Sequence, residues 1–198
     1  VNQWWICDAG RYGYKFIDEN RITQPAARDQ ESVKEVSWEG ILETVASLIR
    51  EPKQSIGVFL SPQMSNEELY LAKKLFQDKL KWKNVFLLSP NAEGDQDDFL
   101  IRADKNPNTK GAELLGFEPA MVGASLQTFL ADCEQDKGEG VLIFGQDLLT
   151  HIDSRYIEPA WNRLKWSIFI GSNSNLTSES ATFVLPSATY AEKNGTFT

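Results

Sequence analysis

Short, continuously apolar segments alternate with segments of helical spacing along most of this chain. An apolar run of about four to eight residues is typical of a strand that is buried on both faces. Strands that alternate with helices predict an α/β fold, here a doubly wound, mostly parallel sheet with helices on both faces. The predicted strands lie at residues 55–61, 84–89, 140–145, 167–171 and 181–186.

The predicted helices lie between these strands. Ser37 is a plausible N-cap of a helix that Pro52 ends, and Ser65 begins another with acidic residues in its first turn. The inward face of the helix after Ser65 is expected to carry Leu69, Ala72, Leu75, Phe76 and Leu80. We further expect helices at 123–133 and 155–164, a helical turn at 109–115 and a short strand at 98–104.

The first 36 residues do not show this alternation. They are rich in aromatic and charged residues, and Pro25 with the polar run at 28–31 marks a connector. We therefore divide the chain into an irregular N-terminal segment, residues 1–36, and an α/β domain, residues 37–198. The first residue is Val1 rather than Met, and residues 195–198 resemble the middle of a secondary-structure element rather than its end. We therefore expect an excised segment of a longer protein.

Charge and hydropathy exclude two kinds of partner. The 198 residues have a formal net charge of -8 and no extended cluster of Lys and Arg, which argues against a nucleic-acid-binding surface. The longest apolar runs are far shorter than the roughly 20 residues of a membrane-spanning helix. We therefore expect neither nucleic-acid binding nor direct insertion into a membrane.

Cysteine and histidine offer few catalytic or metal sites. With only Cys7 and Cys133, a disulfide framework is implausible and a reducing compartment is favoured. Spacing alone favours Cys7 as a small buried side chain, with a metal or cluster ligand as the alternative. Cys133 lies at the end of a predicted helix beside acidic residues and is expected to be inert, and His151 is expected at the surface or packed in a loop.

Two glycines follow predicted strands, where α/β sheets place ligands. Gly145 and Gly171 could border a small-ligand site, but neither belongs to a Gly-x-Gly-x-x-Gly motif, and a glycine there more often just permits a turn. The turn-forming run at 105–109 either fixes a tight turn or contacts a partner or ligand. The acidic pairs at 67–68 and 97–98 are interpreted as a helix start and a solvated loop.

Several stretches resemble one family in the order in which they occur. NQWWICDAGRYGY at 2–14 is similar to the segment that closes the iron–sulfur region of the G-type subunit of bacterial NADH:quinone oxidoreductase (complex I). The closing motif ATFVLPSATYAEKNGTF at 181–197 is shared with the wider molybdopterin oxidoreductase superfamily, which includes formate dehydrogenases and nitrate reductases. Weaker matches to the large domain of the G-type subunit are NEELY at 66–70, ADKNPNTKGA at 103–112 and GQDL at 145–148.

The resemblance has consequences for cofactors. It implies that Cys7 matches the fourth ligand of a 4Fe-4S cluster, whose other three cysteines would lie upstream in the parent protein. The segment alone is then expected to hold no cofactor, and no residue can be assigned as a molybdenum ligand. Because the G-type subunit is itself expected to lack molybdenum, molybdopterin is not expected either. The motifs lie closer together than in most members, which implies a compact version of the superfamily domain.

The resemblance also implies a role within a larger enzyme. The parent protein would pass electrons from NADH through iron–sulfur clusters toward quinone, and this segment would be a non-catalytic scaffold. Its partners would be other subunits of the peripheral arm of complex I, on the cytoplasmic side of the inner membrane. The alternative is a fragment of a molybdopterin-dependent oxidoreductase such as a formate-dehydrogenase-like enzyme. A generic module that binds a small ligand near Gly145 or Gly171 is a third hypothesis.

Overall fold

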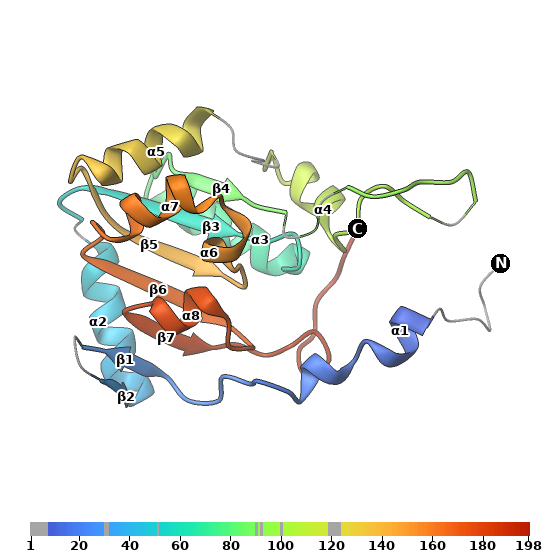
Figure 1. Ribbon diagram of the computed structural model, residues 1–198, viewed down its shortest axis with the longest axis horizontal. Coiled ribbons are helices and arrows are strands. Elements are labelled where there is room, and N and C mark those ends of the chain that lie inside the picture. Colours follow the sequence, from blue (N-terminus) through green and yellow to red (C-terminus); the bar gives the residue numbers. More distant parts are fainter. Residues whose placement is uncertain are drawn as a thin grey trace.

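A mixed sheet runs through the computed structural model (Figure 1). The structure describes residues 8–29, 32–50, 52–89, 91, 93–99, 101–118 and 124–198. Within these residues, seven strands pair in the order β2-β1-β7-β6-β5-β3-β4. The strands are β1 (Ala26–Arg28), β2 (Val33–Glu35), β3 (Ser55–Leu60), β4 (Val85–Leu87), β5 (Gly138–Phe144), β6 (Trp166–Gly171) and β7 (Phe183–Pro186).

The sheet is mostly parallel, as the sequence predicts. All neighbouring pairs from β4 through β3, β5 and β6 to β7 are parallel. The antiparallel part consists of β1, which pairs with both β2 and β7. β4 lies on one side of β3 and β5 lies on the other. The direction in which successive strands are added to the sheet therefore reverses between β3 and β5. An α/β architecture is thus confirmed.

The helices begin where the sequence provides caps. The Ser37 hydroxyl accepts a hydrogen bond from the Gly40 backbone N–H at 3.2 Å. Ser65 and Glu68 form a reciprocal capping box at the start of α3. The α-helices are α1 (Asp8–Tyr12), α2 (Trp38–Arg50), α3 (Asn66–Ala72), α4 (Thr109–Leu114), α5 (Ala124–Glu134), α6 (Leu148–His151), α7 (Ser154–Trp161) and α8 (Leu176–Ser180). Two other helical segments are a 3-10 turn, η1 (Lys15–Ile17), and a π-helix, η2 (Lys73–Lys79), which continues α3.

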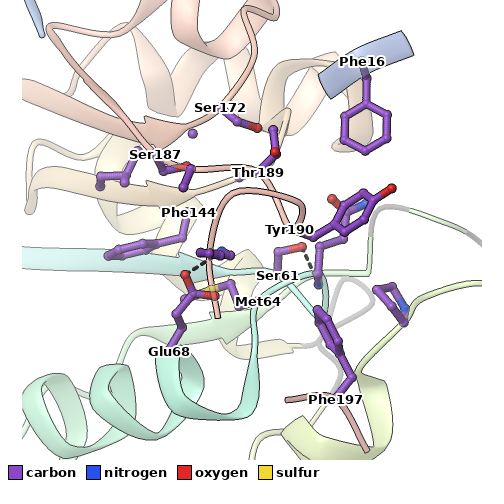
Figure 2. A pocket seen from close by; sticks show the side chains of 17 residues that line it. Phe16, Ser61, Met64, Glu68, Phe144, Ser172, Ser187, Thr189, Tyr190 and Phe197 are labelled. Atoms are coloured by element: carbon purple, nitrogen blue, oxygen red, sulfur yellow. Dashed lines mark hydrogen bonds and ion pairs between the residues drawn. The ribbon is translucent and has the colours of Figure 1, made fainter. Parts of the chain in front are cut away.

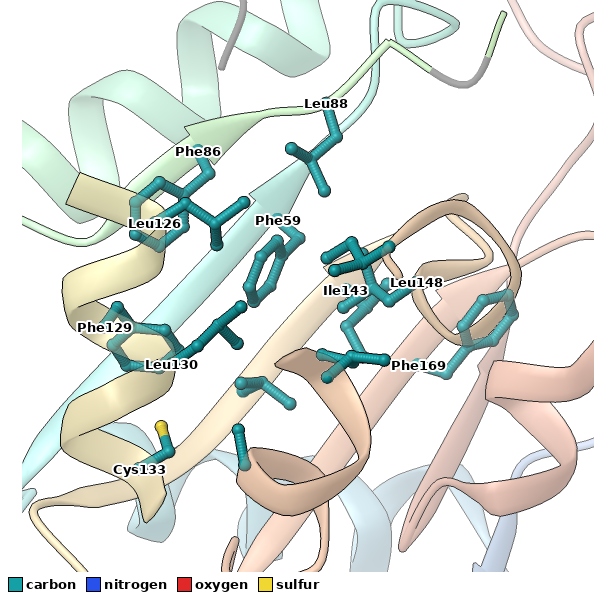
Figure 3. Packing of buried hydrophobic residues seen from close by; sticks show 14 of the residues in the cluster. Phe59, Phe86, Leu88, Leu126, Phe129, Leu130, Cys133, Ile143, Leu148 and Phe169 are labelled. Carbon is teal, nitrogen blue, oxygen red and sulfur yellow. The ribbon is translucent and has the colours of Figure 1, made fainter. Parts of the chain in front are cut away.

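Two hydrophobic clusters lie on opposite faces of the sheet. Alternate residues of one strand separate into the two, so that Phe59 belongs to the first cluster and Val58 and Leu60 to the second. The first cluster also contains residues of α5, α6 and α7, including Phe129 (Figure 3). The second contains residues of α2, α3 and α4, including Ile41. Helices therefore cover both faces of the sheet.

The N-terminal segment is more regular than the sequence suggests. Residues 1–36 are predicted to be irregular, but β1 and β2 form a hairpin there and extend the sheet beyond β7. The pairing of Ala26 with Val184 requires a partner far along the chain, which local sequence patterns do not reveal. The division of the chain into residues 1–36 and 37–198 remains a prediction.

The predicted strand at 98–104 is wrong. None of its described residues lies in a strand. The Asp97 carboxylate instead accepts hydrogen bonds from the backbone N–H groups of Phe99 at 2.9 Å and Ile101 at 2.8 Å. Such a side chain offers the backbone an alternative to a sheet ladder. This loop projects from the sheet beside α4 (Figure 1).

None of the helices among the described residues is long and apolar enough to cross a membrane.

Candidate functional site

A pocket of about 500 Å³ opens at the carboxyl edge of the parallel strands. Its lining includes Ser61, which follows β3, and Gly145, which follows β5. Ser172 follows β6, Ser187 follows β7, and both line it too. The reversal of strand order between β3 and β5 makes this edge the place where α/β sheets bind ligands. The pocket is therefore the candidate site of the described chain.

Aromatic side chains from separate parts of the chain border one side of the pocket. Figure 2 shows Phe16, Tyr190 and Phe197 there, and all of them line the pocket. The ring centroids of Phe16 and Tyr190 lie 5.8 Å apart. Phe16 belongs to the predicted N-terminal segment, so that segment contributes to a site otherwise built by the sheet domain.

Three of the segments that carry the family resemblance, at 66–70, 103–112 and 181–197, meet at this edge. The backbone N–H of Thr196 donates to the Glu67 carboxylate at 2.9 Å, which joins the closing motif to the start of α3. The backbone N–H of Thr198 donates to the Asn108 side-chain oxygen at 2.9 Å. Asn108 is fully buried and its amide group donates to the Met64 carbonyl at 2.8 Å. Three stretches far apart in sequence are therefore bound to one another by hydrogen bonds.

An ion pair crosses the pocket wall. The Lys193 ammonium lies 2.6 Å from a carboxylate oxygen of Glu68 (Figure 2). Partial burial opposes the ionisation of Glu68, but the hydrogen bonds from Lys193 and from the Ser65 backbone outweigh it and hold its pKa below the usual value. The sequence indicated that Glu68 begins a helix, which is confirmed. It did not indicate the partner Lys193.

A second ion pair holds the same C-terminal stretch. Glu192 accepts hydrogen bonds from the Arg21 guanidinium and the Thr189 backbone, and they lower the pKa of Glu192 to about 2. The Arg21–Glu192 distance is 2.8 Å. Hydrogen bonds from Thr196 also lower the pKa of Glu67. Residues 189–198 are thus tied to the body of the protein through three carboxylates.

Acid is expected to loosen residues 189–198. A carboxylate whose pKa is lower in the folded state stabilises that state above its unfolded pKa, and this contribution is lost as the pH falls through the folded pKa. The protection factors of this stretch, which are its hydrogen-exchange rates relative to those of an unstructured chain at the same pH, should stay high down to about pH 4.5 and fall between about pH 4.5 and 2. In Glu192→Gln the stretch should already exchange faster at pH 7, because the Arg21 ion pair is missing. Loosening above pH 5 in the unsubstituted chain would contradict this expectation.

The two glycines named from the sequence both line the pocket. Gly145 has a backbone φ of +63°, which L side chains rarely adopt. A Cβ atom on Gly171 would lie 2.5 Å from the ring of Phe169. Glycine is thus required at both positions for the backbone and its packing. That accounts for both residues without a ligand, although the prediction of a ligand near them remains open.

Gln146 is a buried residue directly after Gly145 of the pocket, and sequence analysis did not single it out. Its side chain is 1% exposed and its amide nitrogen donates to the carbonyls of Leu60 and Leu88. It thereby joins the end of β5 to the ends of β3 and β4. Its amide oxygen has no hydrogen-bond partner among the described residues. The signal in the sequence was its position directly after a strand and a glycine.

The structure does not join the cysteines and the histidine into one site. Cys7 lies outside the described residues, so its predicted role as a cluster ligand remains a prediction. His151 ends α6 and is exposed, as predicted. Cys133 is buried in the first hydrophobic cluster. No group of three or more His, Cys, Asp or Glu side chains within the described ranges could hold a metal ion.

Cys133 is expected to resist alkylation in the folded protein. Burial, followed by the charges of Asp132 and Glu134, raises the pKa of its thiol to about 12. Because the thiolate is the reactive form, iodoacetamide at pH 8 should modify Cys133 at least about a hundredfold more slowly than it does after denaturation. Mass spectrometry of the peptide that contains Cys133 measures both rates. Equal rates would show that this residue is not buried in solution.

The described residues do not fit the cofactors of the superfamily. Cys133, the one cysteine in the described ranges, has the raised pKa of a buried thiol and cannot complete an iron–sulfur site. The charged side chains among the described pocket residues are Glu68 and Lys193, which neutralise each other. The phosphate groups of a pterin dinucleotide require positive charge or several free donors. This lining offers no unpaired cation for them.

Sequence comparison places this chain beside known oxidoreductases. It is 34% identical over 76 residues to NADH-quinone oxidoreductase subunit 3 of Thermus thermophilus, which covers 38% of this chain and 10% of that protein. It is 28% identical over 102 residues to the G-type subunit of NADH-quinone oxidoreductase of Streptomyces coelicolor, or 50% of this chain and 12% of that protein. It is 31% identical over 86 residues to the F420-dependent formate dehydrogenase subunit alpha of Methanocaldococcus jannaschii, or 43% of this chain and 13% of that protein.

The matched stretches span about a tenth of the length of these relatives. Other relatives include two nitrate reductases. No family model matches the chain. The resemblance inferred from the sequence motifs is confirmed: this chain is similar to subunits of NADH-quinone oxidoreductase, to formate dehydrogenases and to nitrate reductases, all of the molybdopterin oxidoreductase superfamily.

Proposed function

We propose that this chain is a segment of a G-type subunit of NADH-quinone oxidoreductase and serves there as a non-catalytic scaffold. The observation that carries the proposal is the mutual binding of three of the resemblance motifs, at 66–70, 103–112 and 181–197, at the carboxyl edge of the sheet. Glu67, Glu68 and Asn108 use their side chains to hold residues 193–198 rather than to face a reactant. Groups engaged in this way give the edge a fixed shape, which is what a scaffold requires.

The parent protein would carry the redox chemistry. Electrons would pass from NADH through 4Fe-4S clusters toward quinone, and Cys7 would be the fourth ligand of one such cluster. This segment would hold neither a cluster nor molybdopterin by itself. Its neighbours would be other subunits of the peripheral arm, on the cytoplasmic side of a bacterial inner membrane.

We also propose that the fold is doubly wound in the sense of the superfamily domain. Support comes from the parallel order β4-β3-β5-β6-β7, which reverses between β3 and β5, and from the clusters on both faces. The N-terminal residues 1–36 would close the iron–sulfur region of the parent protein while β1 and β2 anchor them to the sheet.

Native electrophoresis of membranes from the source organism tests the proposal. An antibody against this segment should detect the parent protein in the band that oxidises NADH and reduces a quinone. The antibody signal should leave that band when the gene is deleted. If the protein instead runs entirely apart from NADH:quinone activity, the proposed function fails.

A second candidate is a fragment of a formate-dehydrogenase-like enzyme. The similarity to a formate dehydrogenase alpha subunit favours it, because that match covers 43% of this chain. Such a parent would have to supply the cations for a pterin dinucleotide from elsewhere, since Lys193 is already paired with Glu68. Formate-dependent dye reduction in the same gel would favour this candidate over the first.

A further inference from the structure

The continuous helix formed by α3 and η2 carries an exposed apolar stripe on the side away from the core. Leu71 is 61% exposed and Leu75 is 37% exposed. Leu75 was predicted to face inward with Leu69 and Phe76, and that expectation is wrong. The segment from Lys73 is π-helical, with the Leu80 backbone N–H bonded to the Leu75 carbonyl, so its wider turns change which side chains face the sheet.

A groove lies along this stripe. Its volume is about 460 Å³ and Leu71, Lys74, Leu75, Asp78 and Lys79 line it. All five residues belong to the helix formed by α3 and η2, and together they form one face of it. Exposure of large apolar side chains to water without a partner is unfavourable, and π-helical turns occur often at functional sites. The groove therefore has the shape and the exposed leucines of a docking surface.

The charge of this face is opposite to that of the chain as a whole. Lys74 and Lys79 line the groove and are exposed, and Lys81 and Lys83, which follow the helix in sequence, are exposed too, whereas the full chain has a net charge of -8. None of these four lysines forms an ion pair with another described residue. Asp78 is the one acidic residue between positions 69 and 83. Lys74, which lies over the Tyr70 ring at 6.0 Å from its centroid, and Lys79 thus place positive charge without an ion-pair partner among the described residues beside the exposed leucines.

We propose that this groove docks an acidic segment of a neighbouring subunit, with apolar side chains on the leucines and Asp or Glu beside the lysines. Charge complementarity selects the partner, because oppositely charged surfaces steer association and repel wrong partners. A protein segment fits better than an anionic lipid surface, because the carboxylate of Asp78 lies among the lining residues and would repel anionic headgroups. The inference rests on the proposed function, in which this segment is a scaffold within a larger assembly.

Site-directed photo-crosslinking in the native host tests this inference. The photoreactive residue p-benzoylphenylalanine would replace Leu71 in the parent protein and, as a control on another exposed surface, Leu42. Mass spectrometry of the purified assembly should identify a crosslink from position 71 to a segment of another subunit in which acidic residues flank apolar ones. Crosslinks from position 42 should not reach that segment. No crosslink from position 71, a crosslink to a second copy of this chain, or one to lipid would overturn the inference.

Charge reversal gives an independent test. In the double variant Lys74→Glu and Lys79→Glu, retention of the crosslinked subunit during purification should fall at least about tenfold. The matched control, Lys15→Glu with Lys53→Glu, makes the same change of charge outside the groove and should retain the subunit. Equal retention in both variants would contradict the inference.

The two proposals can fail separately. If the parent protein lies outside the NADH:quinone complex, the proposed function fails. If the parent protein is found in that complex but the groove variant assembles normally, only the docking inference fails. Circular dichroism of each variant verifies that its fold is retained.

Discussion

Replacing Phe59 by alanine is expected to lower the free energy of unfolding by about 3–5 kcal/mol. Phe59 lies in β3, is 0% exposed and packs in the first hydrophobic cluster (Figure 3). Its ring centroid lies 5.3 Å from that of Phe86 and 6.3 Å from that of Phe129. The substitution removes the transfer free energy of a whole ring and leaves a cavity between β3, β4 and α5. Urea unfolding followed by circular dichroism measures the change.

Phe99→Ala is the matched control. Phe99 is 71% exposed in the loop before α4, so its loss should change the free energy of unfolding by no more than about 0.5 kcal/mol. Similar losses for the two variants would mean that β3 and α5 do not pack as described.

Gly111→Ala is expected to lower the free energy of unfolding by about 2–4 kcal/mol, against the usual preference of helices for alanine. Gly111 lies in α4, and a Cβ atom there would lie 2.1 Å from the side-chain oxygen of Asn66 and 2.3 Å from that of Asn108. Both asparagines would have to move. Asn108 would then lose its hydrogen bonds to Met64 and to the backbone of Thr198.

Gly40→Ala is the control that distinguishes the clash with Asn66 and Asn108 from the general effect of placing alanine in a helix. Gly40 lies in α2, and the nearest atom to its added Cβ is the Ser37 hydroxyl at 3.3 Å. That variant should be unchanged or stabilised by up to about 1 kcal/mol. Hydrogen exchange should also show faster opening of residues 193–198 in Gly111→Ala but not in Gly40→Ala. Wild-type stability of Gly111→Ala would show that Asn66 and Asn108 do not enclose that glycine.

The strands and helix caps of the parallel core are predicted well because each depends on residues that are close together in the sequence. The apolar run that forms β3 is buried along nearly its whole length, and Ser65 caps α3 as its position suggests. Cys133 was expected to be inert from its acidic neighbours, and those neighbours contribute to the raised pKa. Each of these features depends on residues close together in sequence.

The remaining features depend on long-range pairing. The hairpin of β1 and β2 pairs with the edge of β7, a strand far along the chain. The ion pair of Glu68 with Lys193 joins residues that are 125 positions apart. The outward position of Leu75 follows from a π-helix, for which helical spacing gives no signal. The candidate site was predicted only through Gly145, Gly171 and the turn-forming run at 105–109, of which Pro107 lines the pocket. The side chains that bind its parts together, Gln146 among them, could not be identified without the fold.

Above all, we propose that this segment is the cofactor-free part of an electron-transfer subunit. Anaerobic elemental analysis for iron and molybdenum, made on this chain and on the whole protein encoded by its gene, tests this proposal most directly. We expect iron in the whole protein alone and molybdenum in neither. Near-stoichiometric molybdenum in the whole protein would contradict the proposal and make this segment part of a molybdopterin enzyme.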